Sequence, residues 1–317
     1  MNTILVTGSC GFIGAAVVEK LAKRGDRVIG FDLRSNPAFD RLLQRHSNIV
    51  FEPGELTEWP QIVDVFLKYK PTSVVHCAAI VGVVNSLASP IATMRVNIEG
   101  SLNVLTAMRQ TGAKRFVHIS SEEVYGPFMA AKIDETHPCF PIKPYGISKF
   151  AVEQLARDFA REHGLTVLNL RTCWVYGPGL PRPRVPKTLI DAALDGAPLH
   201  IEAGADFTVD HVYIDDVANG ICQALDAPAP KHEAYHISTG VSVTLGEIVE
   251  IVRDLIPGAQ LSIGPGNYAF TKGVETVKKG ALDITRAKTD FAYTPKYDIR
   301  AGLKAYVAAR REERSHA

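Results

Sequence analysis

The sequence predicts an α/β fold, a doubly wound parallel sheet followed by a smaller mixed α/β lobe. Short apolar runs alternate with longer amphipathic segments through the first half of the 317-residue chain. Runs that are apolar along their whole length are typical of parallel strands buried between two helix layers. After residue 176 the elements become shorter and prolines cluster between residues 178 and 186, which indicates a change of architecture.

The expected elements follow from these patterns in order along the chain. We expect strands at residues 4–6, 27–31, 49–51, 73–76, 115–119 and 166–170, and helices at 12–23, 60–69, 91–111 and 145–163. In the lobe we expect strands near 199–201 and 235–237 and a helix at 244–255, which begins with the capping pair Thr244 and Glu247. The predicted domains are residues 1–176 and residues 177–317, the second interleaved with the last strands and helices of the first.

The composition is that of an ordinary globular protein and argues against several classes of partner. Apolar residues make up 46%, charged residues 22%, and the net charge is +1, so neither nucleic acid nor an anionic membrane is expected to bind. No apolar run approaches the roughly 20 residues of a membrane span. Five scattered cysteines without metal-ligand spacing predict reduced thiols, a cytoplasmic location and no metal site.

A glycine-rich turn joins the first predicted strand to the first predicted helix. Gly8, Gly11 and Gly14 permit a tight turn and a close approach of a pyrophosphate to the helix N-terminus. Asp32 ends the second strand, where a carboxylate can accept hydrogen bonds from both ribose hydroxyls and repel a 2′-phosphate. The pattern predicts a Rossmann-type domain in residues 1–176 that binds NAD rather than NADP, a preference that the nearby Arg34 weakens.

Tyr145 and Lys149 form the most informative pair in the chain. A spacing of four places both side chains on one face of a helix. The ammonium group favours the phenolate, so we expect a lowered tyrosine pKa and a base usable near neutral pH. Any surface helix can carry such a pair, and it is the upstream glycine turn that favours a catalytic role.

Several motifs in a fixed order resemble one known family. Besides the glycine turn and the Tyr145–Lys149 pair, the chain carries His76-Cys77-Ala78-Ala79, Ser120 to Gly126 and Val175-Tyr176-Gly177-Pro178. The glycine spacing is G-x-x-G-x-x-G and departs from the G-x-G-x-x-G fingerprint. Together these motifs resemble the extended short-chain dehydrogenase/reductase superfamily, in particular its NAD-dependent nucleotide-sugar epimerase/dehydratase family.

The resemblance implies a role for each matching residue. Tyr145 would be the acid/base, Lys149 would bind the nicotinamide ribose and lower the tyrosine pKa, and Ser121 would hydrogen-bond the reacting oxygen. Glu55 stands where the family usually has Asp. The implied cofactor-binding positions are Gly8, Gly11, Phe12, Ile13, Gly14, Asp32, Glu55, Leu56, Ala78, Ala79, Asn97, Tyr145, Lys149 and Val175.

The implied chemistry is hydride transfer at a carbinol carbon. A tyrosinate takes the proton of a substrate hydroxyl while hydride passes to NAD. A retained ketone leads to epimerisation or dehydration, and a released ketone makes the enzyme a net dehydrogenase. Glu122 and Glu123 fall where the family's sugar 4,6-dehydratases carry an acidic pair, which could protonate a leaving hydroxyl and remove a C5 proton. A solvated pair of loop carboxylates is an equal interpretation.

The substrate lobe departs from the family pattern at three positions. Val209 and Trp174 replace an arginine and an asparagine that usually hold a diphosphate, and Lys272 is the nearest counterpart of a second arginine. A loop predicted to face the cleft offers other cations for a phosphate or a carboxylate. With Ser121 and Trp174, the candidate substrate-binding residues are Arg182, Arg184 and Lys187.

Three functions are therefore weighed. The first is an NAD-dependent nucleotide-sugar epimerase or dehydratase, and the second is a net NAD-dependent dehydrogenase of a free sugar, sugar acid or other small hydroxy compound. The third is a cofactor-sensing scaffold, against which the complete Ser121, Tyr145 and Lys149 set argues. The family also implies a homodimer built on the helices around 97–111 and 151–163. Their apolar residues could instead face the sheet: Leu102, Leu105, Met108, Val152, Leu155 and Phe159.

Overall fold

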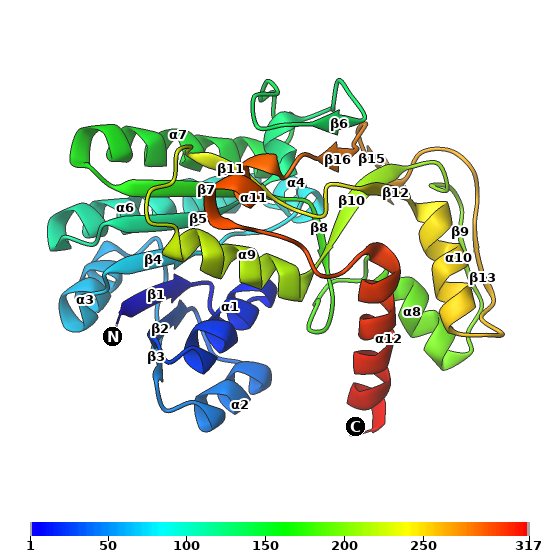
Figure 1. Ribbon diagram of the computed structural model, residues 1–317, viewed down its shortest axis with the longest axis horizontal. Coiled ribbons are helices and arrows are strands. Elements are labelled where there is room, and N and C mark those ends of the chain that lie inside the picture. Colours follow the sequence, from blue (N-terminus) through cyan, green and yellow to red (C-terminus); the bar gives the residue numbers. More distant parts are fainter. Residues whose placement is uncertain (1, 316–317) are drawn as a thin grey trace.

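The computed structural model describes residues 2–315, and its centre is a parallel sheet of seven strands (Figure 1). The strands lie in the order β11-β7-β5-β4-β1-β2-β3. Their bounds are Thr3–Thr7 for β1, Arg27–Asp32 for β2, Ile49–Pro53 for β3, Ser73–His76 for β4, Arg115–Ser121 for β5, Thr166–Thr172 for β7 and Ala234–Ile237 for β11. The order reverses between β1 and β4, which is the point where doubly wound folds bind ligands. The predicted fold class is confirmed.

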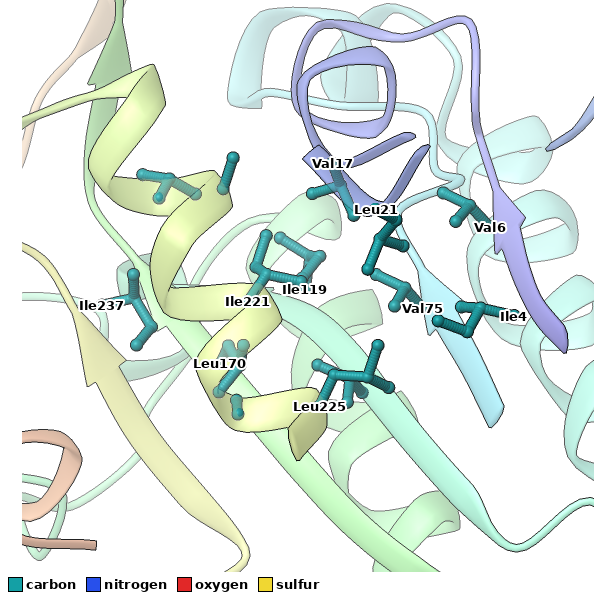
Figure 2. Close-up of a cluster of buried hydrophobic side chains, with 14 of the residues drawn as sticks. Ile4, Val6, Val17, Leu21, Val75, Ile119, Leu170, Ile221, Leu225 and Ile237 are labelled. Carbon is teal, nitrogen blue, oxygen red and sulfur yellow. The ribbon is translucent and has the colours of Figure 1, made fainter. Parts of the chain in front are cut away.

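Helices cover both faces of this sheet. One face carries α1 (Phe12–Lys23), α2 (Pro37–Arg45), α9 (Ile214–Asp226) and α11 (Thr285–Phe291), and the other carries α3 (Trp59–Tyr69), α6 (Gly100–Thr111) and α7 (Pro144–His163). Figure 2 shows Val17 and Leu21 of α1 packed with Ile221 of α9 over the sheet. Successive strand residues point to opposite faces, so both cores are completed by the same apolar strands.

The predicted helix at residues 91–111 is wrong as a single helix. The structure has α4 (Val83–Ala88), α5 (Pro90–Met94), a π-helical segment η1 (Arg95–Glu99) and then α6. Asn97 is buried in the π-helical segment, and its side chain bonds to groups outside the helix. Apolar periodicity cannot reveal such a segment, which is frequent at functional sites.

The smaller lobe has its own core, to the right of the main sheet in Figure 1. Strands β8 (Trp174–Tyr176), β10 (Thr208–Tyr213) and β12 (Ser242–Thr244) form one sheet, and β9 (Leu199–Ile201) pairs with β13 (Leu261–Ile263). Helices α8 (Lys187–Asp195), α10 (Leu245–Leu255) and α12 (Ile299–Ser315) pack against them. The predicted capping box of Thr244 and Glu247 is present at the start of α10.

The expected lobe strand at 235–237 lies elsewhere. It is β11, at the edge of the main sheet, where Ala234 pairs with Asn169 of β7. Helices α9 and α11 also belong to the core of the main sheet. A short buried strand has the same local pattern in either sheet, so only long-range pairing assigns it. The chain after residue 176 therefore contributes to both cores.

Two short strand pairs lie near the junction of the two parts. Strand β6 (Lys132–Ile133) pairs with β16 (Ala281–Leu282), and β14 (Ala269–Thr271) pairs with β15 (Val274–Glu275). The β6–β16 pair joins the segment before α11 to the loop that follows β5. Across residues 2–315, no helix combines the length and apolar character that a membrane crossing requires.

Candidate active site

The turn between β1 and α1 can be made only with glycine at its key positions. Gly8 has a φ of +66°, and a Cβ there would lie 2.6 Å from the backbone nitrogen of Ala78. A Cβ on Gly14 would lie 2.0 Å from the carbonyl oxygen of Gly8. Gly11 is the N-cap of α1 and has no side chain that could cover the helix N-terminus. The turn therefore leaves backbone N–H groups open to a phosphate.

Asp32 ends β2 beside this turn. Its Oδ2 accepts a hydrogen bond from the Cys10 backbone N–H at 2.9 Å, and its Oδ1 accepts one from Leu33 at 2.8 Å. Each oxygen keeps a further lone pair that can accept a ribose hydroxyl. Arg34 is exposed. The glycine turn and this carboxylate together fit a dinucleotide.

Four further predicted cofactor-binding residues lie in two segments of the chain. Phe12 and Ile13 open α1 and pack against the lobe core. Glu55 and Leu56 follow β3, and Leu56 is buried against Gly100, where a Cβ would lie 2.7 Å from the Leu56 Cβ. Leu56 is 6% exposed, whereas Glu55 is exposed.

The remaining predicted cofactor contacts line the end of β4 and the junction of the cores. Ala78 and Ala79 follow β4 and are partly buried, and the Ala78 N–H donates to Thr7 Oγ1 at 3.4 Å. Val175 lies in β8 opposite Val212 and packs against both cores. These three residues therefore line the site with apolar side chains.

Asn97 acts through its neighbours. Its Oδ1 accepts from the Ile80 N–H at 2.7 Å, and its Nδ2 donates to the Ile80 carbonyl at 3.2 Å and to Ser148 Oγ at 2.9 Å. Ser148 Oγ in turn donates to the Tyr145 carbonyl at 2.8 Å. The amide therefore ties the loop after β4 to the first turn of α7 and positions Tyr145.

Burial dominates the ionisation of both members of the tyrosine–lysine pair. Lys149 donates to the Ile119 carbonyl at 2.7 Å, and burial lowers its pKa to about 8. Burial raises the pKa of Tyr145 to about 12, opposed by the charge of Arg182 and then by a hydrogen bond from Ser121. The pKa of Tyr145 is therefore raised and not lowered as expected, because desolvation outweighs the nearby charges, and the charge that opposes the rise most is that of Arg182 and not that of Lys149.

The two serines at the end of β5 have different surroundings. Ser120 Oγ donates to Glu153 Oε1 at 2.5 Å, in a buried cluster beneath the site. Ser121 Oγ accepts from the Glu123 N–H at 3.2 Å, and its hydroxyl bears on the pKa of Tyr145. Of the two serines, Ser121 is the one whose hydroxyl acts on Tyr145.

Glu122 and Glu123 begin the 3₁₀ turn η2 (Glu122–Tyr125), and neither is a solvated loop carboxylate. Glu122 is 2% exposed, and burial raises its pKa to about 7. Its Oε2 has no hydrogen-bond partner within residues 2–315. Glu123 Oε1 lies 3.5 Å from Lys279 Nζ. The two carboxylates thus have different environments, which is the condition for distinct acid and base roles.

The three residues that depart from the family pattern bring no charged group to the site. Trp174 is buried in an aromatic cluster, with its ring centroid 5.5 Å from that of Phe207 and 5.9 Å from that of Tyr268. Val209 is fully buried in the lobe core. Lys272 is exposed at the β14–β15 turn.

The predicted basic loop divides into residues near the site and one residue outside it. Arg182 Nη1 donates to the Val81 carbonyl at 3.0 Å, and the Arg184 guanidinium lies 3.9 Å from the centroid of the Trp174 ring. Both arginines oppose the rise in the pKa of Tyr145. Lys187 instead pairs with Asp191 within α8, so the structure does not bring it to the other candidates.

A small pocket lies beside these groups. Glu123, Trp174, Phe207, Phe270 and Lys279 are among the residues that line it. Sequence reasoning missed Lys279, because it comes from an irregular segment between β15 and β16 and no motif marks it. Only the folded chain places it beside Glu123.

The comparisons with known proteins agree with this geometry. The profile of the NAD dependent epimerase/dehydratase family matches residues 4–238. A UDP-glucuronate 4-epimerase of Thermodesulfobacterium geofontis is 30% identical over 97% of this chain and 95% of its own. The crystal structure of a Thermotoga maritima UDP-glucose 4-epimerase with UDP-glucose matches with a TM-score of 0.88 and 31% identity, covering 98% of this chain and 99% of that one.

A dehydratase is nearly as similar. The dTDP-glucose 4,6-dehydratase of Streptomyces venezuelae, solved with NAD bound, has a TM-score of 0.87 and 26% identity, covering 99% of this chain and 98% of its own. Both kinds of relative match over almost the whole chain, lobe included. The family resemblance predicted from the motifs is confirmed, and the chain belongs to the NAD-dependent epimerase/dehydratase family of enzymes.

Proposed function

We propose that this protein is a nucleotide-sugar epimerase or dehydratase with NAD as its cofactor. The proposal rests on one observation. Ser121, Tyr145 and Lys149 lie on the same side of the sheet as the glycine turn, where the parallel strands end. Relatives with both activities match the chain over nearly its whole length. NAD, when bound, supplies a reversible hydride acceptor. The catalytic residues proposed are Ser121, Tyr145, Lys149, Glu122 and Glu123.

The residues of the chain divide the proton chemistry among themselves. The Tyr145 phenolate takes the proton of the substrate hydroxyl, the phenol that results returns it, and Ser121 holds the substrate oxygen. Because burial raises the pKa of Tyr145 to about 12, its phenolate needs nearby positive charge. Arg182 and Arg184 supply such charge from the loop, and Lys149 would hold the nicotinamide ribose of bound NAD. In this proposal, residues 1–176 bind the cofactor and residues 177–317 mainly bind the substrate.

We also propose a cytoplasmic homodimer. All five cysteines are free thiols, which supports a reducing compartment. Leu105, Met108 and Val152 are buried within the chain, so they are not available for a contact between two copies. Other large apolar side chains on α4 to α7 are exposed and support a contact through this face: Val84, Leu87, Ile91, Leu102 and Ile147.

A net dehydrogenase acting on a free sugar acid is the second candidate. It is favoured by the buried, uncharged Trp174 and Val209, which stand where the family usually holds a diphosphate. A substrate without a diphosphate would not need those anchors.

One set of measurements separates the two candidates. The purified protein is assayed for bound NAD, then incubated with UDP-glucose, UDP-glucuronate and dTDP-glucose, and products are separated by chromatography. Epimer or 4-keto-6-deoxy product without NADH accumulation supports the main proposal. Steady NADH formation from a free aldose or sugar acid, with no turnover of the nucleotide sugars, contradicts it and supports the second candidate.

A further inference from the structure

His76 ends β4, and its buried imidazole bridges two segments that are far apart in the sequence. Its Nδ1 lies 2.7 Å from Thr7 Oγ1, and its Nε2 lies 2.8 Å from Ser101 Oγ. Thr7 is the last residue of β1, directly before the glycine turn, and Ser101 lies in the first turn of α6, directly after the π-helical segment. The imidazole therefore connects the strand that leads into the cofactor turn with the segment that contains Asn97.

The direction of each hydrogen bond in this bridge follows from the number of protons available. The Ser101 hydroxyl has one proton and donates it to the Asn97 carbonyl, which can only accept. Ser101 Oγ is therefore the acceptor for His76, and Nε2 of the imidazole carries the hydrogen. Nδ1 is then an acceptor, so Thr7 donates to it, while Thr7 Oγ1 accepts from the Ala78 N–H at 3.4 Å. The donors all point one way, from the loop after β4 to the π-helical segment.

Burial keeps the bridge in this form. His76 and Ser101 are each 1% exposed, and Thr7 is fully buried. Burial, and then the positive charge of Lys149, lowers the pKa of His76 to about 3, so the ring stays neutral near pH 7 and keeps one donor and one acceptor. Bulk water does not compete for these bonds, and the loss of one partner leaves a buried polar atom unpaired.

The hydrogen bonds continue from the π-helical segment to Tyr145. Serine hydroxyls that bond a carbonyl one turn back bend helices, and here Ser101 holds the backbone of Asn97 within an irregular segment. The Asn97 amide bonds both backbone groups of Ile80 and donates to Ser148 Oγ at 2.9 Å. Ser148 donates to the Tyr145 carbonyl at 2.8 Å. A continuous, buried series of hydrogen bonds therefore runs from the end of β1 to the first turn of α7.

We propose that His76 is a positioning residue for Tyr145. By bridging Thr7 and Ser101 it fixes the π-helical segment, so that the Asn97 amide holds Tyr145 in place relative to the glycine turn. Hydride transfer and proton transfer at one carbon require the cofactor and the base in a fixed relative position. The inference rests on the proposed function, because it takes Tyr145 as the acid/base of that reaction.

A second buried histidine provides a matched control. His118 lies opposite His76 in the neighbouring strand β5, with the ring centroids 6.0 Å apart. Its Nδ1 lies 3.0 Å from Asn169 Oδ1, and within residues 2–315 it bonds to no member of the series. His76→Phe and His118→Phe both keep an aromatic ring and both remove buried hydrogen bonds. Both variants should therefore lose stability, and only His76→Phe should disturb Tyr145.

Steady-state kinetics with NAD-loaded protein measure the effect on the reaction. His76→Phe should lower kcat about tenfold and change the KM and the Kd for NAD by less than about threefold, whereas His118→Phe should change all three by less than about threefold. Ser101→Ala should lower kcat by a similar factor. The double variant His76→Phe with Ser101→Ala should be no slower than His76→Phe alone, because both changes act through the Asn97 carbonyl. His76→Gln, which keeps an N–H donor, should recover part of the loss.

Hydrogen exchange of the NAD-loaded proteins, read by mass spectrometry, tests the series without turnover. Peptides that cover residues 78–82 and 144–149 should exchange faster in His76→Phe than in the wild type and at the wild-type rate in His118→Phe. Ser101→Ala carries the same comparisons if His76→Phe does not fold. Wild-type protein that turns over no nucleotide sugar contradicts the proposed function, and faster exchange in these peptides then still supports the inference. Unchanged exchange in both peptides, or equal losses of kcat in His76→Phe and His118→Phe, overturns it.

Discussion

Arg171 and Glu153 form a buried ion pair directly beneath the active site. Arg171 Nη2 lies 2.6 Å from Glu153 Oε2, and the two side chains are 3% and 0% exposed. Glu153 also accepts from Ser120, and Arg171 Nη1 donates to the Tyr125 hydroxyl at 2.7 Å. The pair therefore joins β7 and α7 to the end of β5, the strand that carries Ser121.

Removing one partner of this pair should destabilise the protein strongly. Arg171→Met leaves the carboxylate of Glu153 buried without its counter-ion, and such losses cost about 3–5 kcal/mol. The double variant Arg171→Met with Glu153→Leu should be more stable than the single variant, because no buried charge remains. Urea unfolding measures both. Arg300→Met, which breaks the exposed pair with Asp254, should cost less than about 1 kcal/mol. A single variant no less stable than this control contradicts the prediction.

Tyr145→Phe should remove the acid/base while leaving the fold and the cofactor cradle intact. The hydroxyl is the only group deleted, and general acid–base catalysis is worth about 10²- to 10⁴-fold in rate. We expect kcat to fall by that factor while the Kd for NAD changes by less than about threefold, since Gly8, Gly14 and Asp32 are untouched. Steady-state kinetics and fluorescence titration with NAD report the two quantities. Unchanged turnover would rule out the proposed base.

Asp32→Ala should weaken NAD and relax the choice between NAD and NADP. The carboxylate has acceptor capacity left beyond its bonds to Cys10 and Leu33, and hydrogen bonds to a charged group are worth about 1.5–3 kcal/mol. We expect the Kd for NAD to rise by about 10- to 100-fold and the NADP/NAD affinity ratio to increase. Asp254→Ala, at an exposed position, is the matched control. If the Kd for NAD and the NADP/NAD affinity ratio are both unchanged, Asp32 does not contact the ribose.

The sequence predicted those parts of the site that are formed by residues close together in the chain. The helix at Phe12–Lys23 and the strand at Ser73–His76 lie where the patterns placed them, because their turns and apolar runs are contiguous. The glycine turn was predictable for the same reason. The family resemblance then supplied the roles of Ser121, Tyr145 and Lys149.

What the sequence could not predict depends on distant contacts. Lys279 reaches Glu123 across more than 150 residues of chain, and β11 joins β7 across the lobe. The direction of the Tyr145 pKa shift depends on burial, which a spacing of four residues does not reveal. Lys187 was predicted to bind substrate on the strength of a basic loop, but its charge is taken by Asp191 one helical turn away.

Glu122 should give the stability of the protein a specific pH dependence. Burial raises its pKa from 4.5 to about 7 in the folded state, so the folded protein holds this proton more tightly than the unfolded chain. The stabilisation is therefore fully present below about pH 4.5 and is lost as the pH rises through 7. Glu122→Gln cannot ionise, so the Tm of the wild-type protein should fall relative to that of the variant as the pH rises from 4.5 to 7. Calorimetric scans at half-unit steps measure the difference. Parallel profiles for the two proteins would show that Glu122 ionises as readily in the folded state as in the unfolded chain.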